Sequence, residues 1–265
     1  MDSGVILNII KIGGNVIDNP DALNEFLEHF SSIKGKKILV HGGGKKASAL
    51  AQRLGVEVEM VEGRRVTNQE MLEIAVMVYA GWINKSIVAK LQKFGCDAIG
   101  LSGADANLIE GMKRPKKEVD FGYVGDLLHD SVNHNMLKKF MELGLTPVFS
   151  AITHNKKGQL LNTNADTIAS SLSASLSSNY QVNLIYCFEK DGVLKDVEDE
   201  SSVIEHIDLA SYKVLEKSGE IFDGMLPKLN NAFDALQKGV SAVYIGNASK
   251  LHQFNQGCFG TRITL

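Results

Sequence analysis

Two glycine-rich turns are the parts of this sequence best suited to bind a charged ligand. Gly13-Gly14 ends the mostly β-branched run Val5–Ile12, and Gly42-Gly43-Gly44 follows the apolar run Lys37–Val40. A turn between a buried strand and a helix presents backbone N–H groups beside the positive end of the helix dipole, which favours anions. Chain geometry alone would explain glycine at one such turn. Two of them in one chain predict neighbouring loops that hold phosphate or carboxylate groups.

Five polar residues could complete an anion site. Lys11 ends the first apolar run, so its ammonium group either reaches solvent or faces a ligand phosphate. Arg65 suits bidentate capture of a carboxylate, although a surface ion pair would also explain it. Asn162 and Asp166 begin a helix, as caps or as site residues. Lys228 lies in the first turn of another helix, where it opposes the helix dipole unless an anion shares the site.

A dinucleotide site is an alternative explanation of the second glycine turn. Gly42, Gly44 and Ala47 fit the pattern G-x-G-x-x-A, and Glu62 lies where a ribose-binding carboxylate is expected. The P-loop pattern G-x-x-x-x-G-K-[ST] is absent from the sequence. An NAD-dependent oxidoreductase therefore stays an alternative, but it gives no role to the other charged residues.

Strands and helices alternate along the chain, which predicts an α/β fold with a mainly parallel sheet. The predicted strands are Val5–Ile12, Lys37–Val40, Val56–Val61, Ala98–Leu101, Thr146–Ile152, Asn183–Cys187 and Ala242–Ile245. The predicted helices are Pro20–Phe30, Lys45–Leu54, Met136–Leu143, Asn164–Leu176 and Leu226–Gln237, together with one long helix that ends near Phe94.

The long helix has features of a subunit interface. Thr67 and Glu70 match a capping box, with Thr67 as the N-cap, and Gly95 ends the helix. Its apolar residues cover more than one stripe, so the helix is expected to be buried on two sides. We expect a homodimer formed through residues 68–94.

Composition excludes several classes of protein. The 265 residues carry 28 basic and 31 acidic side chains, a net charge of −3, which argues against a nucleic-acid binder. Three widely spaced cysteines form neither a disulfide framework nor a metal-ligand cluster. The first residues show no basic stretch before their apolar run and no small-residue cleavage site after it, so we expect a strand there rather than a signal peptide. No apolar run reaches the roughly 18 residues of a membrane span. A cytoplasmic location is expected.

The chemically suggestive residues occur together in an order and spacing that resembles the acetylglutamate kinases of the amino acid kinase superfamily. The resemblance covers essentially the whole chain. Its motifs are Lys11-x-Gly13-Gly14, Val40-His41-Gly42-Gly43-Gly44, Gly63-x-Arg65-Val66-Thr67, Asn162-x-Asn164-Ala165-Asp166 and Asp223-Gly224-Met225-x-x-Lys228.

The resemblance implies a fold, a reaction and residue roles. The fold would be a three-layer sandwich with a mainly parallel central sheet and two lobes: residues 1–179 for acylglutamate binding and dimerisation, and 180–265 for the nucleotide. The reaction would be phosphorylation of the γ-carboxylate of N-acetyl-L-glutamate by MgATP, in arginine biosynthesis. The implied catalytic residues are Lys11, Lys228 and Asp166; the substrate-binding residues are Gly43, Gly44, Arg65 and Asn162; the phosphate- or nucleotide-binding residues are Gly13, Gly14 and Glu189.

The chemistry of this reaction fits the residues. A glutamate γ-carboxyl has a pKa near 4.3, so it is already an anionic nucleophile at neutral pH and needs no general base. The reaction needs charge neutralisation and in-line placement of two anions. Two lysines, glycine turns and Mg²⁺ bound through the ATP phosphates, with no metal ligand from the protein, would meet that need. The seven histidines then need no chemical role, and His41 is interpreted as structural.

Three departures from the family pattern leave alternatives open. Glu189 stands where an aspartate is usual, Ala104 replaces a lysine, and Arg64 replaces a commonly apolar residue. Arg64 could bind the extra carboxylate of an N-succinyl substrate. However, Arg64 and Arg65 are adjacent, and adjacent residues of an extended chain face opposite ways. A non-catalytic amino-acid sensor is a further alternative. Since few residues precede Val5, we expect no N-terminal helix of the arginine-inhibited type and no inhibition by arginine.

Overall fold

The computed structural model describes residues 4–196, 198–218 and 225–265. The chain forms two compact units: Met1–Ile38 with Leu172–Leu265 (unit 1), and Leu39–Ser171 (unit 2). The N-terminal strand therefore belongs with the C-terminal part of the chain. The lobes expected from the sequence, 1–179 and 180–265, were defined by the ligand that each would bind and not by which residues pack together. Their ligands stay a prediction.

Unit 1 is built on mostly parallel strands. Its strands are β1 (Ile6–Ile12), β11 (Gln181–Phe188), β12 (His206–Ile207), β13 (Ala242–Asn247) and β14 (Thr261–Ile263), in the order β12-β14-β13-β11-β1. The β13–β14 pair is antiparallel, and the other pairs are parallel. Apolar side chains are buried on both faces of β1, as the continuous β-branched run predicts.

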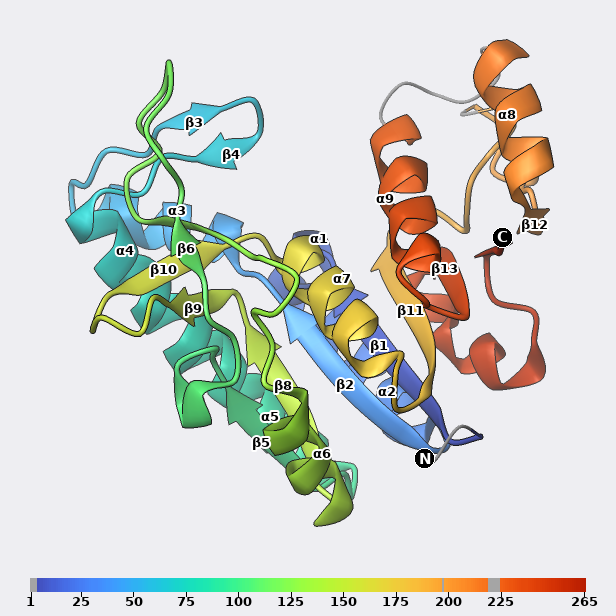
Figure 1. The fold of residues 1–265 in the computed structure, drawn as a ribbon, viewed down its shortest axis with the longest axis horizontal. Helices are drawn as coiled ribbons and strands as arrows, with labels where there is room; N and C mark the ends of the chain where they lie inside the picture. The colour runs from blue at the N-terminus through green and yellow to red at the C-terminus, as the bar shows by residue number, and fades with distance from the viewer. Residues whose placement is uncertain (1–3, 197, 219–224) are drawn as a thin grey trace. The chain divides into compact units, whose positions relative to one another are not determined.

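Helices accompany these strands. They are α1 (Gly14–Asp18), α2 (Pro20–Ser32), α8 (Leu209–Ser218), α9 (Leu226–Gln237) and the 3₁₀ segment η3 (Ala248–Gln256). Helix α9 packs along β13 (Figure 1). Helix α7 (Ala165–Leu176) begins in unit 2 and ends in unit 1. Elements α1, α8, η3, β12 and β14 were not predicted from the sequence.

Unit 2 contains a parallel set of strands and a second, small sheet. The parallel set is β2 (Lys36–His41), β8 (Thr146–Ser150) and β5 (Ala98–Leu101), in the order β2-β8-β5. Strand β2 begins in unit 1 and ends in unit 2. The small sheet contains β6 (Met112–Lys113), β7 (Val124–Asp126), β10 (Leu160–Thr163) and β9 (Ile152–His154). No strand was predicted between Leu101 and Thr146, so β6 and β7 were missed.

The remaining elements of unit 2 are one hairpin and several helices. The hairpin joins β3 (Met60–Val61) to β4 (Arg64–Arg65). The helices are α3 (Gly44–Arg53), α4 (Gln69–Ala75), the π-helical segment η1 (Val76–Ile83), α5 (Asn84–Lys93), η2 (Asp105–Asn107) and α6 (His134–Glu142). With mainly parallel strands and accompanying helices in both units, the predicted α/β class is confirmed.

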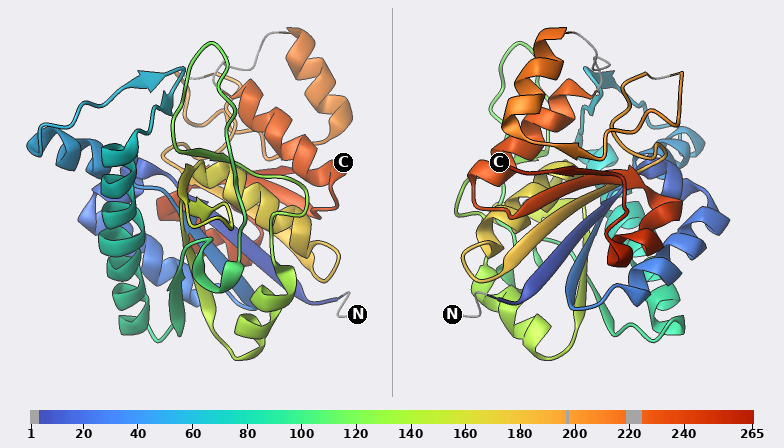
Figure 2. Two further views of the ribbon diagram at one scale, coloured as in Figure 1. Left: turned by 60° about the vertical axis from the view of Figure 1, so that its left-hand side comes forward. Right: turned by 90° about the vertical axis from the view of Figure 1, so that its right-hand side faces the viewer.

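The long helix is present, but its cap differs from the prediction. Segments α4, η1 and α5 follow one another without a break (Figure 2). The N-cap is Asn68, whose Oδ1 accepts the N–H of Met71 at 2.8 Å. Thr67 is fully buried and its hydroxyl donates to the carbonyl of Arg65, so the prediction of Thr67 as the cap was wrong.

The same helix, Gln69–Lys93, is long and apolar enough to cross a membrane by length and composition. Half of its apolar window is buried inside the structure. Ile83, Ile87 and Leu91 of this helix are buried. Core helices of soluble proteins meet the same criteria, so the helix is explained by its packing in unit 2.

Candidate active site

In unit 1, the Gly13-Gly14 turn and Lys11 lie at the carboxyl ends of parallel strands. The N–H of Gly13 donates to the carbonyl of Cys187 at 3.1 Å and so ties the turn to the end of β11. Lys11 pairs in register with Tyr186, and it is 9% exposed. The carboxyl ends of parallel strands are where open α/β sheets bind their ligands.

The two lysines predicted to act together meet at one aromatic ring. The Nζ of Lys11 lies 5.2 Å from the centroid of the Phe188 ring, and the Nζ of Lys228 lies 3.8 Å from it. Lys228 comes from the first turn of α9, and Phe188 is the last residue of β11. Three distant parts of the sequence thus place two cations beside the Gly13 turn. Asp223 and Gly224 of the Lys228 motif lie outside the described residues.

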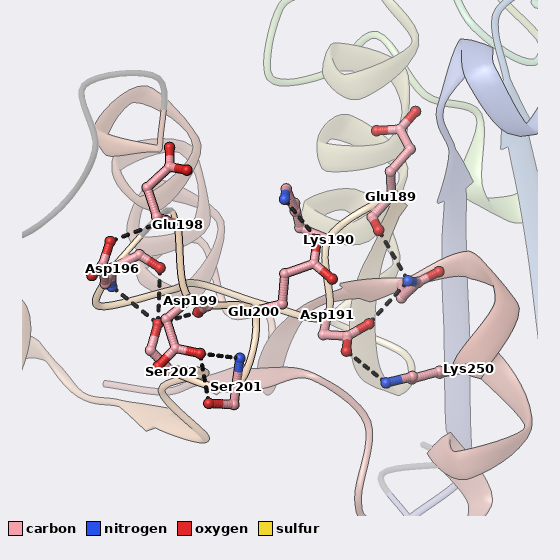
Figure 3. Close-up of polar contacts among 11 residues, drawn as sticks. Glu189, Lys190, Asp191, Asp196, Glu198, Asp199, Glu200, Ser201, Ser202 and Lys250 are labelled. Carbon is pink, nitrogen blue, oxygen red and sulfur yellow. Dashed lines mark hydrogen bonds and ion pairs between the residues drawn. The ribbon is translucent and has the colours of Figure 1, made fainter.

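Beyond Phe188, the carboxylate with defined partners is Asp191, not Glu189. The Asp191 side chain accepts hydrogen bonds from Lys250 Nζ at 2.5 Å and Asn247 Nδ2 at 2.9 Å (Figure 3). Glu189 is exposed; its backbone carbonyl accepts from Asn247 Nδ2, and its side chain points away from Lys250 (Figure 3). Partial burial acts to raise the pKa of Asp191, but the bonds from Lys250 and Asn247 outweigh it and hold that pKa below its usual range. The role of Glu189 in binding a nucleotide stays a prediction.

In unit 2, the second glycine turn requires glycine for steric reasons. Gly43 is the N-cap of α3. A Cβ atom there would collide with Cδ1 of Ile83 and would lie 2.8 Å from Cδ1 of Tyr79. Because η1 packs so closely on the turn, a side chain at Gly43 would displace Tyr79 and Ile83, and the turn leads directly into the N-terminus of α3, a type of position that favours anions.

Arg65 is held against this turn. Its Nη2 donates to the carbonyl of Gly44 at 3.0 Å and to the hydroxyl of Ser48 at 2.8 Å. Burial raises the pKa of the Tyr79 hydroxyl, and the nearby charge and hydrogen bond of Arg65 act in the opposite direction. The guanidinium group therefore has a fixed orientation beside the beginning of α3, where it can bind a carboxylate.

The β3–β4 hairpin presents Arg65 and separates it from Arg64. Glu62 and Gly63 form its turn with φ of 49° and 73°, as a tight hairpin turn requires. Arg64 is exposed, whereas Arg65 is partly buried. The position of Glu62 at an exposed turn gives no support to a ribose-binding role.

The Asn162–Asp166 segment provides both the cap of a helix and side chains that are candidates for the site. Asn164 is the cap: its Oδ1 accepts the N–H groups of Asp166 at 2.8 Å and Thr167 at 3.0 Å. Asn162 instead donates from Nδ2 to the hydroxyl of Thr67 at 3.1 Å, close to Arg65 in sequence. The carboxylate of Asp166 is partly buried at the start of α7 and is not needed as a cap.

His41 lies in a buried network beneath the glycine turn. It is 0% exposed; its Nδ1 lies 2.8 Å from the carbonyl of Gly42, and its Nε2 lies 3.1 Å from Asn84 Nδ2. Asn84 Nδ2 also donates to the carbonyl of Val148 at 2.9 Å. Because the amide of Asn84 can only donate through Nδ2, the ring carries its proton on Nδ1 and accepts at Nε2. Burial lowers the pKa of His41 from 6.5 to about 4, against the raising effect of its bond to Gly42.

Sequence reasoning missed four residues that hold the site together. Ser48 and Tyr79 orient Arg65, Thr67 binds Asn162, and Phe188 contacts both lysines. Ser48 lies one helical turn after Gly44, so spacing could have revealed it. The other three depend on contacts between elements far apart in the sequence. Among the residues whose placement is described, no group of three or more His, Cys, Asp or Glu side chains is arranged to hold a metal ion.

Comparison with known proteins identifies the class. The model of the amino acid kinase family matches residues 7–247. The chain is similar in structure to N-acetylglutamate synthase from Neisseria gonorrhoeae, with TM-score 0.80 and 20% identity over 99% of this chain and 60% of that one. It is also similar to carbamate kinase from Giardia lamblia bound to AMP-PNP, with TM-score 0.72 and 15% identity over 100% and 99% of the two chains. Both show the fold, and the chain belongs to the amino acid kinase family.

Relatives with similar sequences show which branch of the family the chain belongs to. The acetylglutamate kinase of Cytophaga hutchinsonii is 52% identical over 246 residues, which is 92% of each chain. That of Parabacteroides distasonis is 46% identical over 257 residues, covering 97% of this chain and 98% of the relative. Within its family the chain therefore falls among the acetylglutamate kinases and is a kinase enzyme, as the motifs predicted.

Proposed function

We propose that the chain transfers the γ-phosphoryl group of ATP to the γ-carboxylate of N-acetyl-L-glutamate. The products are N-acetyl-L-glutamyl 5-phosphate and ADP, and the reaction is the second step of arginine biosynthesis. The observation that carries the proposal is the convergence of Lys11, Lys228 and the Gly13 turn on Phe188. Full-length identity of 46% to 52% to acetylglutamate kinases supports it.

The proposed mechanism needs no proton transfer. An ionised γ-carboxylate oxygen attacks the γ-phosphorus, the bond from phosphorus to the bridging oxygen breaks, and ADP leaves with that electron pair. Lys11 and Lys228 offset the charge on the transferring group, and Asp166 orients them. The N–H of Gly14 binds a phosphate oxygen, whereas the N–H of Gly13 donates to the carbonyl of Cys187 and holds the turn in place. Mg²⁺ bound through the ATP phosphates would offset part of their negative charge.

The acyl substrate is proposed to bind through unit 2. Arg65 binds the α-carboxylate, in the orientation that Ser48 and Gly44 give it. Gly43 and Gly44 donate backbone N–H groups, and Asn162 contributes an amide. These contacts leave the γ-carboxylate as the reacting group. Arg64 is exposed rather than held at the turn, so no observation favours an N-succinyl substrate.

The quaternary structure is proposed to be a homodimer that uses the long helix. Met77 and Trp82 in η1 are 54% and 70% exposed, large values for apolar side chains. A second copy of the chain that covers them would complete the burial of the helix on two sides. Residues 1–179 would bind acylglutamate and dimerise, residues 180–265 would bind the nucleotide, and the enzyme would act in the cytoplasm.

The test is a coupled ADP-release assay with MgATP and either N-acetyl-L-glutamate or N-succinyl-L-glutamate. We expect activity with the acetyl compound, and a fall in kcat of about 10²- to 10³-fold in Lys11→Ala and Lys228→Ala. Lys34→Ala, which removes an exposed lysine after α2, is the matched control and should retain activity. If the folded wild-type protein released no ADP with either substrate, the proposal would be overturned.

A further inference from the structure

Phe188 lies beside both lysines that are assigned to the phosphoryl group and beside Gly13. Its ring lies below the ammonium groups of Lys11 and Lys228, at 5.2 and 3.8 Å from the centroid. Its Cδ1 lies 3.8 Å from the point where a Cβ atom of Gly13 would stand. No motif of the sequence pointed to this residue, which ends β11 immediately before Glu189.

We propose that Phe188 is a positioning residue for the phosphoryl transfer: its ring face holds the ammonium groups of Lys11 and Lys228 at the Gly13 turn. This inference rests on the proposed function, because it assigns Phe188 to the two lysines that act there.

The ring solves an electrostatic problem. Two lysines that act on one phosphoryl group must approach each other, and their like charges repel. The face of an aromatic ring carries partial negative charge and attracts cations within about 6 Å of its centroid. Both Lys11 and Lys228 meet that criterion at the same ring. An aliphatic side chain of similar volume would fill the space without offsetting the repulsion.

The ring can hold the lysines without removing them from the reaction. An ammonium group has three N–H donors, and a ring beneath it faces only one side of the group. Donors on the other side can point to phosphoryl oxygens. The ring is itself fixed, because it stacks on Tyr186 with a centroid distance of 6.2 Å and an interplanar angle of 18°. The contact can therefore persist from the bound substrates to the transition state.

The experiment replaces Phe188 with phenylalanines that carry one, two or three ring fluorines. Fluorine withdraws electron density from the ring face while it leaves the shape nearly unchanged. We expect kcat for MgATP and N-acetyl-L-glutamate to fall in steps, by about 3- to 30-fold in total. KM for N-acetyl-L-glutamate should stay within about twofold, since the proposed mechanism gives Phe188 no role in binding that substrate.

Two substitutions and one control test whether the aromatic ring itself is responsible for the effect on kcat. Phe188→Leu should match the most fluorinated protein, and Phe188→Tyr should retain most of the wild-type kcat. The same fluorine series at Phe94, whose centroid lies 5.3 Å from Lys93 Nζ, is the matched control and should leave kcat unchanged. A flat series at Phe188, or full activity of Phe188→Leu, would overturn the inference.

A spectroscopic measurement separates this inference from the proposed function. In spectra of ¹³C-lysine-labelled protein, the ε-methylene protons of Lys228 should be shifted upfield by the ring, and the shift should vanish in Phe188→Leu. An inactive wild type that shows the shift would refute the proposed function and, with it, the role of Phe188, while leaving the contact established. An active wild type without the shift would refute the positioning role alone.

Discussion

Acidification should destabilise unit 2 through His41, a group the reaction does not use. The ring is fully buried beneath the glycine turn, with Nδ1 bonded to Gly42 and Nε2 accepting from Asn84. A proton added at Nε2 would face the amide donor of Asn84 and would be placed in an apolar environment. Burial accordingly lowers the pKa of His41 from 6.5 to about 4.

The sign and size of the effect follow from that shift. In the unfolded chain His41 takes up a proton near pH 6.5, whereas in the folded chain it does so only near pH 4. The contribution of the neutral ring to stability is therefore fully present above pH 6.5 and is lost as the pH falls to about 4. Each pKa unit corresponds to about 1.4 kcal/mol, so the shift predicts a loss of about 3 kcal/mol across this window.

The assay compares urea unfolding of the wild type and His41→Gln at several pH values between 8 and 4. The glutamine of this variant is neutral throughout and still offers an amide donor and an acceptor. The wild type should lose about 3 kcal/mol more than the variant between pH 8 and pH 4, since all other titrating groups are shared. His206→Gln, which removes an exposed histidine, is the control and should show the wild-type pH dependence.

An NMR measurement addresses the cause directly. Long-range ¹H–¹⁵N spectra should show the Nδ1–H tautomer of His41, with no titration between pH 8 and pH 5. Parallel stability curves for the wild type and His41→Gln would refute the reasoning, as would a His41 signal that titrates near pH 6.5.

Three further predictions concern the substrate side and the assembly. Ser48→Ala removes the hydroxyl that accepts from Arg65 Nη2, so KM for N-acetyl-L-glutamate should rise about fivefold with little change in kcat; an unchanged KM in steady-state kinetics would contradict this. Thr67→Val leaves the amide of Asn162 without its acceptor in a partly buried place, which should lower the free energy of unfolding by about 1–3 kcal/mol in urea titrations; wild-type stability would count against the assigned bond. Trp82→Glu places a charge on the exposed face of the long helix and should convert the proposed dimer to a monomer in light scattering; a persistent dimer would place the interface elsewhere.

The local parts of the fold could be predicted because their causes are local. The continuous apolar run that became β1 and the glycines that close helices follow from burial and backbone geometry within a few residues. The same is true of the cap at Asn164, where the asparagine side chain needs only the next turn of helix. The family was likewise identified from the order of short motifs, and the match over residues 7–247 confirms it.

Failures occurred where a distant partner decides between local alternatives. Thr67 satisfies the rule for an N-cap, yet its hydroxyl binds the carbonyl of Arg65 and the amide of Asn162, which lies 95 residues away. Asn68 caps the helix in its place. The small sheet was missed for a related reason: its strands are two to four residues long, too short to show a period of two.

Phe188 shows the same limit at the site itself. In the sequence Phe188 is an apolar residue at the end of a strand. Glu189 was predicted to bind the nucleotide instead, because the family pattern has an acid at that position. Only the register of β1 with β11, which places Lys11 beside Tyr186 and Gly13 beyond Cys187, brings the ring under the first lysine. The entry of α9 brings Lys228 over the same ring. Sequence motifs can thus identify the charged groups of the site. The residue that holds the two lysines together can be identified only once strand pairing and helix packing are known.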